Sequence, residues 1–115
     1  MERTEKLYDV IFAGNYTKDT IITPAGTRHV DGGGMNYAAH AGKALGLRSA
    51  VVTRLSKEDE HVVEMLRADG IDCYPVYSPY STLMTLEYKT LDVDKRNLYV
   101  THTAGTIHPE HLDGL

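Results

Sequence analysis

Three short apolar runs that alternate with two helical patterns constrain the fold of this chain more than any other feature. The runs at residues 7–13, 49–55 and 72–77 are rich in β-branched and aromatic residues, and their length is typical of buried strands. Apolar residues at helical spacing separate these runs at residues 35–46 and 57–69. Such alternation predicts an α/β fold in which parallel strands are joined by right-handed crossovers.

A second group of segments has a different periodicity. Apolar and polar residues alternate over 83–91 and recur over 97–102, and the segments 20–24 and 27–31 flank a Pro24-Ala25-Gly26 turn. A period of two is typical of half-buried antiparallel strands. We therefore expect a separate antiparallel sheet inserted into the parallel core.

Charge and cysteine content exclude several classes of protein. The 12 Lys and Arg residues against 16 Asp and Glu give a net charge of -4, which argues against a general nucleic-acid or anionic-membrane partner. No apolar run approaches the roughly 20 residues of a spanning helix, and the amino terminus lacks a secretory signal. Cys73 is the only cysteine, which favours a reducing compartment. We expect a cytoplasmic protein.

Two neighbouring features suggest a ligand site. Gly32, Gly33 and Gly34 precede a helical pattern, where bare backbone lets a ligand approach the amides at the helix start. Asp19 follows the first predicted core strand, at the edge where α/β sheets bind ligands. Its carboxylate can accept hydrogen bonds from the neighbouring hydroxyl groups of a sugar or polyol. Taken alone, a tight turn for the glycines and a capping role for Asp19 remain open.

Taken together and in order, these motifs resemble the PfkB family of carbohydrate kinases, the ribokinase-like enzymes. The resemblance extends through residues 68–72 and the Ser81-Thr82 pair, so it covers nearly the whole chain, and it is nearest to myo-inositol-kinase-like members. The positions that match the family without a gap are Gly14, Asp19, Gly32, Gly33, Tyr37, Leu45 and Gly46.

The resemblance implies an incomplete ribokinase-like three-layer core with an inserted antiparallel lid. Residues 1–115 would form the N-terminal part of the kinase domain. The expected core covers about 1–19, 32–82 and 103–115, and the expected lid strands cover about 20–31 and 83–102.

The resemblance also implies ATP-dependent transfer of phosphate to a hydroxyl group, with magnesium. The acceptor is expected to be a small sugar or polyol. We expect Tyr88 to be a lid residue facing the pocket. Asn36 replaces Tyr37 as a contact only if the register shifts by one. The expected substrate contacts are Asp19, Gly32, Gly33, Asn36, Tyr37 and Tyr88.

Two departures from the family limit this expectation. The late Gly-Ala-Gly-Asp segment, which supplies the anion hole and the general base, does not occur in this chain. We therefore predict no catalytic residue here, no motif that binds ATP or magnesium, and no activity of the chain alone. The family's Gly-x-Asp-x-x-Gly loop is replaced by residues 55–60, of which we interpret 57–60 as a solvated first helical turn. We expect a homodimer or association with a C-terminal portion.

Other interpretations differ in class. A non-catalytic module that dimerises through the lid is the main alternative. A dinucleotide-binding enzyme is disfavoured because the segment after Gly14 does not contain the remaining glycines of the Gly-x-Gly-x-x-Gly motif. His102, His108 and His111 lie close in sequence, but a metal site needs further ligands, so we predict ordinary exposed histidines and no metal.

Overall fold

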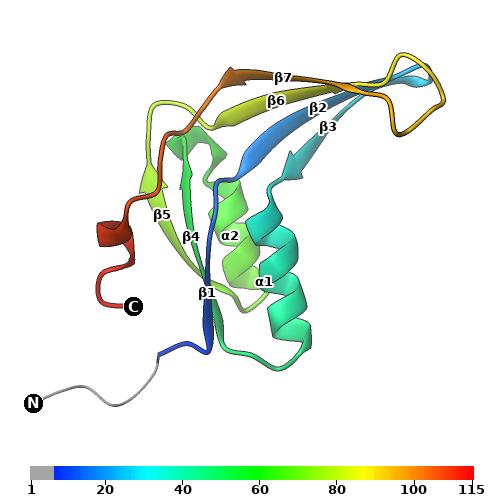
Figure 1. Ribbon diagram of the computed structural model, residues 1–115. Helices are drawn as coiled ribbons and strands as arrows, with labels where there is room; N and C mark the ends of the chain where they lie inside the picture. The colour runs from blue at the N-terminus through cyan, green and yellow to red at the C-terminus, as the bar shows by residue number, and fades with distance from the viewer. Residues whose placement is uncertain (1–6) are drawn as a thin grey trace, which may run out of the picture.

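The computed structural model describes residues 7–115 and contains two sheets (Figure 1). The core sheet is parallel, with the strand order β1-β4-β5. Its three strands alternate with two helices along the chain. The elements are β1 (Val10–Ala13), α1 (Gly34–Ala44), β4 (Ser49–Leu55), α2 (His61–Ala68) and β5 (Asp72–Tyr77). The predicted alternation of strands and helices is confirmed.

Both helices lie on the same face of the core sheet, and the C-terminal segment with η2 (Pro109–Leu112) lies on the other side (Figure 1). Two successive right-handed crossovers in one direction place their helices on one face, which explains this arrangement. The apolar core lies between that face and the helices. None of the helices in residues 7–115 is both long and apolar enough to cross a membrane. The buried core cluster contains Tyr16, Met35, Ala39, Val51, Leu55, Val62, Val63, Leu66, Ile71 and Cys73.

The second predicted helix is divided. A short 3-10 turn, η1 (Lys57–Asp59), precedes α2, and the Ser56 hydroxyl accepts a hydrogen bond from the Glu58 amide at 3.4 Å. Ser56 therefore caps this segment as expected from its position. The predicted continuous helix over 57–69 is wrong at its start.

The second sheet has the strand order β3-β2-β6-β7. Its strands are β2 (Thr17–Thr23), β3 (Gly26–Gly32), β6 (Thr82–Glu87) and β7 (Asn97–His102). The two outer pairs are antiparallel, as the sequence predicts, but the central β2–β6 pair is parallel. Both central strands leave the core at the same end and run outward, so they must share a direction (Figure 1).

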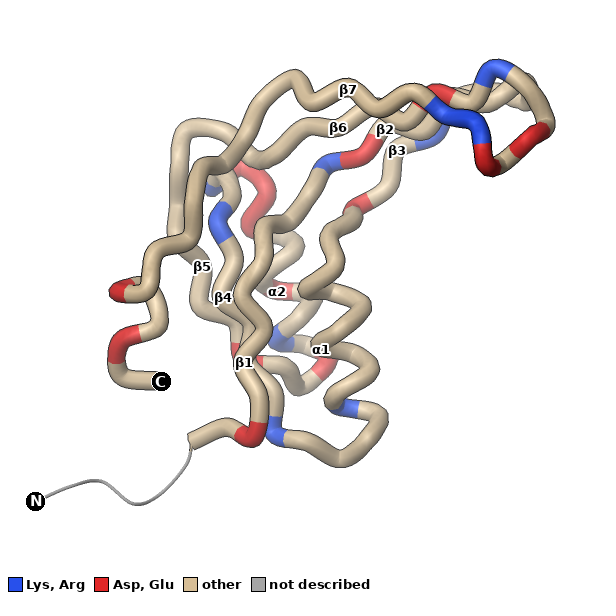
Figure 2. The backbone as a smooth tube through the Cα atoms, viewed as in Figure 1, with Lys and Arg blue, Asp and Glu red and all other residues tan. Residues whose placement is uncertain are grey.

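The second sheet projects away from the core. The radius of gyration is 16.2 Å and the longest dimension 59 Å, whereas a compact chain of this length has a radius of gyration of about 13 Å. The tip of the projection carries charged side chains of both signs, from the loop between β6 and β7 (Figure 2). The second sheet therefore has more solvent-facing surface than a core layer would.

Gly42 allows α1 to approach β1 and β4 closely. A Cβ built on Gly42 would lie 2.8 Å from Ser49 Oγ and 3.3 Å from the Phe12 ring. Glycine within a helix costs about 1 kcal/mol relative to alanine, so close packing is the reason for it here, as the sequence predicts.

Gly42→Leu should lower the free energy of unfolding by about 1–3 kcal/mol, because the added side chain overpacks the contact between helix and sheet. The measurement is urea denaturation followed by circular dichroism. Ala41→Leu is the matched control, since Ala41 is exposed on the same helix and should change stability by less than about 0.5 kcal/mol. Equal effects of the two substitutions would contradict this packing.

Candidate functional site

Asp19 lies within β2, and its carboxylate rests on the end of β3. The register pairs Thr17 with Gly32, and Asp19 follows two positions later on the same face of the sheet. A Cβ built on Gly32 would lie 2.3 Å from Asp19 Oδ2 and 2.8 Å from Thr17 Oγ1. Glycine is therefore required at position 32 to accommodate this carboxylate. The sequence analysis began the second sheet at about residue 20, whereas β2 begins at Thr17, so Asp19 belongs to the second sheet and not to the core.

The other carboxylate oxygen of Asp19 can accept a further hydrogen bond. Asp19 Oδ1 is buried and has no hydrogen-bond partner within residues 7–115. A buried polar atom without a partner is unfavourable by about 1–3 kcal/mol, and most such atoms in proteins are paired. A ligand hydroxyl donating to Oδ1 would remove this penalty.

Gly33 packs the start of α1 against residues 15–17, just before Asp19 in the chain. Its φ is +111°, and a Cβ built there would lie 2.8 Å from the Asn15 carbonyl oxygen. Gly33 is also the N-cap of α1, so no side chain caps the helix, and the first turn contains no acidic residue. The Asn36 amide donates to the Gly33 carbonyl at 3.1 Å. The Gly34 and Met35 amides at the positive end of the helix dipole point to a place where a ligand oxygen can accept.

Asn36 belongs to a separate groove. A groove of about 170 Å³ lies between α1 and α2 at the base of β3. Asp31, which lines it, pairs with Lys18 and so lies on the sheet face opposite to Asp19. Of the predicted contacts, Gly32 and Asn36 line this groove and Asp19 does not. Its lining residues are Tyr16, Asp31, Gly32, Asn36, His40, Val62, Met65, Leu66 and Asp69.

The two predicted tyrosine contacts lie on other elements than Asp19. Tyr37 is in the first turn of α1 and its surface is 68% exposed. Tyr88 follows β6, where its hydroxyl accepts a hydrogen bond from Arg96 Nη1 at 3.3 Å. Because Asp19 pairs with Met84, Tyr88 is displaced along the strand by four residues, or about 13 Å. The structure brings Asp19 and Gly32 into contact and displaces Tyr88 from them.

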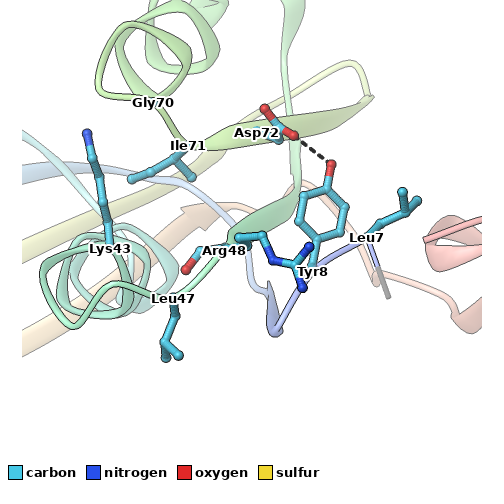
Figure 3. A pocket seen from close by; sticks show the side chains of 9 residues that line it. Leu7, Tyr8, Lys43, Leu47, Arg48, Gly70, Ile71 and Asp72 are labelled. Atoms are coloured by element: carbon cyan, nitrogen blue, oxygen red, sulfur yellow. Dashed lines mark hydrogen bonds between the residues drawn. The ribbon is translucent and has the colours of Figure 1, made fainter. Parts of the chain in front are cut away.

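A larger cavity of about 280 Å³ lies at the amino-terminal ends of β4 and β5, near Tyr8 and Arg48 (Figure 3). Tyr8 donates a hydrogen bond to Asp72 across this region at 2.7 Å. None of the predicted site residues lines this cavity. It is larger than the groove near Gly32, but its position at the opposite end of the strands separates it from the candidate site.

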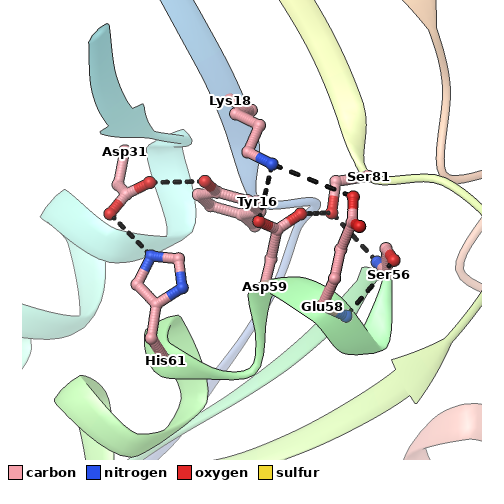
Figure 4. A network of polar contacts seen from close by, with 8 residues as sticks. All are labelled: Tyr16, Lys18, Asp31, Ser56, Glu58, Asp59, His61 and Ser81. Carbon is pink, nitrogen blue, oxygen red and sulfur yellow. Dashed lines mark hydrogen bonds and ion pairs between the residues drawn. The ribbon is translucent and has the colours of Figure 1, made fainter.

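An ion pair links the second sheet to the core near Asp19 (Figure 4). Lys18 Nζ lies 2.8 Å from Asp59 Oδ1. Ser81 Oγ donates to Asp59 Oδ2 at 2.6 Å, and the Ser56 amide donates to Ser81 Oγ at 2.9 Å. Burial alone would raise the pKa of Asp59, but the hydrogen bonds from Lys18 and Ser81 outweigh it and lower that pKa. Asp59 is thus a charged, fully partnered carboxylate.

A second polar link runs from the core to the end of β3. The fully buried Tyr16 donates its hydroxyl hydrogen to Asp31, whose other oxygen lies 3.1 Å from His61 Nε2 on α2 (Figure 4). Burial, followed by the hydrogen bond to Asp31, raises the pKa of Tyr16. The phenol therefore stays neutral as a donor.

The sequence analysis missed both links. The segment 57–60 was interpreted as solvated, yet Asp59 is only 3% exposed. The error has a physical cause: Lys18 and Ser81, which make burial of this carboxylate tolerable, are remote in sequence. Tyr16 gave one signal that could have been used, since an aromatic residue between a core strand and a polar strand is suited to bury its ring and bond its hydroxyl.

The C-terminal histidines and Cys73 do not form a further site. The His108 amide donates to His111 Nδ1 at 2.9 Å, so this pair stabilises η2. Across residues 7–115, no three His, Cys, Asp or Glu side chains are grouped as metal ligands. Burial raises the pKa of the Cys73 thiol to about 11, as expected for an unreactive cysteine.

Structural comparison identifies the fold as that of ribokinase-family kinases. A pyrophosphate-dependent kinase of this family, solved with sulfate, has a TM-score of 0.81 at 25% identity over 91% of this chain and 37% of its own. Such a kinase solved with a pyrophosphate analogue and myo-inositol gives 0.77 at 22% identity, over 91% and 36%. The nucleoside kinase of Burkholderia thailandensis, in complex with inosine, gives 0.66 at 18% identity, over 81% and 35%.

The resemblance stated from the sequence is therefore confirmed, including its myo-inositol-kinase relatives. The chain spans only a little over a third of the length of these kinases. No family model matches the sequence, and no curated protein matches it. The structural likeness thus carries the assignment.

His40 should titrate above its ordinary pKa of 6.5, because the hydrogen bond to Asp69 at 2.9 Å and then that to the Asn36 carbonyl favour the charged ring. The contribution of the charged His40 ring to the free energy of unfolding is fully present below pH 6.5. It is lost as the pH rises through the pKa of His40 in the folded state. NMR titration of the imidazole measures this pKa. In Asp69→Asn the midpoint should move back toward 6.5, and a midpoint that ignores this substitution would contradict the assignment.

Proposed function

We propose that this chain, which has the fold of ribokinase-family kinases, forms the acceptor-binding part and lid of a kinase that phosphorylates a hydroxyl group of a sugar or polyol. The observation that carries the proposal is the buried, unpartnered Oδ1 of Asp19, in a carboxylate whose Oδ2 lies against the bare backbone of Gly32. A carboxylate oxygen and uncapped helix amides suit a ligand whose hydroxyl groups donate to the one and accept from the other.

The second sheet supports a lid role because its two faces differ. The face that carries Asp19 is otherwise apolar at its centre, whereas the face with Lys18 is mainly polar. A sheet that closes over a bound ligand excludes water with such a face. Six apolar residues from all four strands share the face with Asp19: Ile21, Val30, Met84, Leu86, Leu98 and Val100.

Phosphoryl transfer needs a donor and magnesium, and residues 7–115 do not fit these groups. No carboxylate cluster suitable for a metal occurs in this part of the chain, and neither a P-loop nor a Gly-Ala-Gly-Asp segment occurs in the sequence. The role proposed for this chain is therefore to bind and orient the acceptor. The donor, ATP by the resemblance or pyrophosphate as in two of the similar kinases, would bind residues beyond the shared portion.

Myo-inositol is the first probe for the acceptor, because a kinase of this fold has been solved with it. Inosine, found with the more distant nucleoside kinase, is the second probe. Both present neighbouring hydroxyl groups, which is the chemistry that Asp19 can accept.

Asp19→Asn should weaken myo-inositol binding roughly tenfold to a hundredfold, since a hydrogen bond to a charged group contributes about 1.5–3 kcal/mol. Isothermal titration calorimetry and the ligand-induced rise in Tm measure the loss. Asp94→Asn, the same change in the exposed loop between β6 and β7, should bind like the wild type. The proposal is refuted if the wild-type chain binds neither myo-inositol nor inosine, or if Asp19→Asn binds as tightly as the wild type.

A non-catalytic dimerising module remains the second candidate, and one observation favours it. Leu98 and Val100 are 50% and 53% exposed on the apolar face of the second sheet. Exposed apolar residues that form a continuous face commonly mark protein–protein contacts. In this candidate the face is covered by a second copy of the chain, and no sugar is bound.

Val100→Lys should shift a dimer to monomer in light scattering coupled to size-exclusion chromatography, because a lysine would have to be buried in the apolar contact. Leu91→Lys, in the exposed tip loop, is the control and should leave the oligomeric state unchanged. If the wild-type chain is already monomeric at high concentration, the dimerising module is excluded.

A further inference from the structure

We propose that Asp59 is a positioning residue, which acts through Lys18 to fix the direction in which Asp19 presents its free carboxylate oxygen. This inference rests on the proposed function for its consequence in binding, but its structural part can be tested without any ligand.

The first step is the geometry of the strand. Lys18 and Asp19 are consecutive in β2, and consecutive side chains of a strand point to opposite faces. A constraint on the Lys18 side chain on one face therefore bears on the orientation of the strand that directs Asp19 on the other. Lys18 Nζ is held 2.8 Å from Asp59 Oδ1, on the core side of the junction.

Asp59 is itself held in place by burial and by a hydrogen bond. Its side chain is 4% exposed, and Ser81 donates to its other oxygen at 2.6 Å. Ser81 is held in turn by the amide of Ser56, at the end of β4 (Figure 4). The Lys18 ammonium is thus held by a buried carboxylate of the core, with the exposed Glu58 carboxylate as a more distant partner at 4.0 Å.

The third step concerns the residues that enter β2. Asn15 Oδ1 accepts from the Arg54 amide at 3.2 Å, and the Tyr16 amide donates to Thr53 Oγ1 at 2.9 Å. These bonds fix where the strand leaves the core. They do not reach beyond Tyr16. From Thr17 on, β2 is held by its pairing with β3 and β6, and the ion pair of Lys18 with Asp59 ties this part of the second sheet to the core.

The ligand-free test compares Asp59→Asn and Lys18→Met with the wild type by ¹H–¹⁵N NMR. Each substitution should shift the amide signals of Asp19, Gly32 and Gly33, and should change the residual dipolar couplings of β2 relative to those of β4. Lys18→Met keeps the aliphatic stem and removes a partly exposed charge, so it serves if Asp59→Asn does not fold. Unchanged signals and couplings in a folded variant would overturn the inference.

The binding test uses myo-inositol at a temperature where all variants are folded. Asp59→Asn, Lys18→Met and the double variant should each raise Kd by a similar factor, roughly tenfold, because all three break the same link. A purely structural role would instead lower Tm while leaving Kd unchanged, and independent effects would multiply in the double variant. Either result would overturn the inference.

Lys89→Met is the matched control. It removes a lysine whose ammonium lies 3.8 Å from Glu87 in an exposed ion pair of the same region, and such pairs contribute little. It should change neither the Asp19 signals nor Kd. Failure of the wild-type chain to bind would refute the proposed function alone, since the NMR comparison would still decide whether Asp59 positions Asp19.

Discussion

The geometry of the candidate site depends on buried charge pairing at the junction of the two sheets. Only residues 14–16 separate β1 from β2, so the chain passes from the core to the projecting sheet almost without a linker. The ion pair of Lys18 with Asp59, and the bond from Tyr16 to Asp31, hold the two bodies together there. Asp59 is buried whereas Lys18 is 42% exposed. Loss of the lysine would leave a buried carboxylate without its charged partner, which is strongly destabilising.

Asp19 is unusual in sharing its face with apolar residues. A charged group in such surroundings is unfavourable unless a partner is bound. Here Oδ2 lies against Gly32, while the buried Oδ1 has no hydrogen-bond partner within residues 7–115. The same arrangement explains why position 32 has no side chain. Asp19 thus has a buried acceptor oxygen without a partner. A carboxylate that serves only the fold normally has its hydrogen bonds satisfied, so this arrangement favours a ligand-binding role.

The parts of the fold that follow from local patterns were predictable from the sequence. The buried strand at 49–55, the cap at Ser56 and the close packing at Gly42 each depend on neighbouring residues. The glycines and Asp19 could be singled out, and Gly32 does lie against Asp19. The burial of Asp59 could not be predicted, because its partners lie 41 residues before it and 22 residues after it. The parallel direction of β6 beside β2 could not be predicted either. A period of two predicts which side chains are buried, but it does not predict the direction of the neighbouring strand.

The parallel pairing at the centre of the second sheet has a consequence for how the chain folds. Thr17 pairs with Thr82, 65 residues later, and every core strand and helix lies within or next to that interval. The β2–β3 and β6–β7 hairpins are local in sequence, whereas joining them requires closing this long loop, whose entropy is unfavourable until the core has shortened it. The two hairpins should therefore dock late, and until then their inner edges are open to pairing with other chains, as in domain swapping.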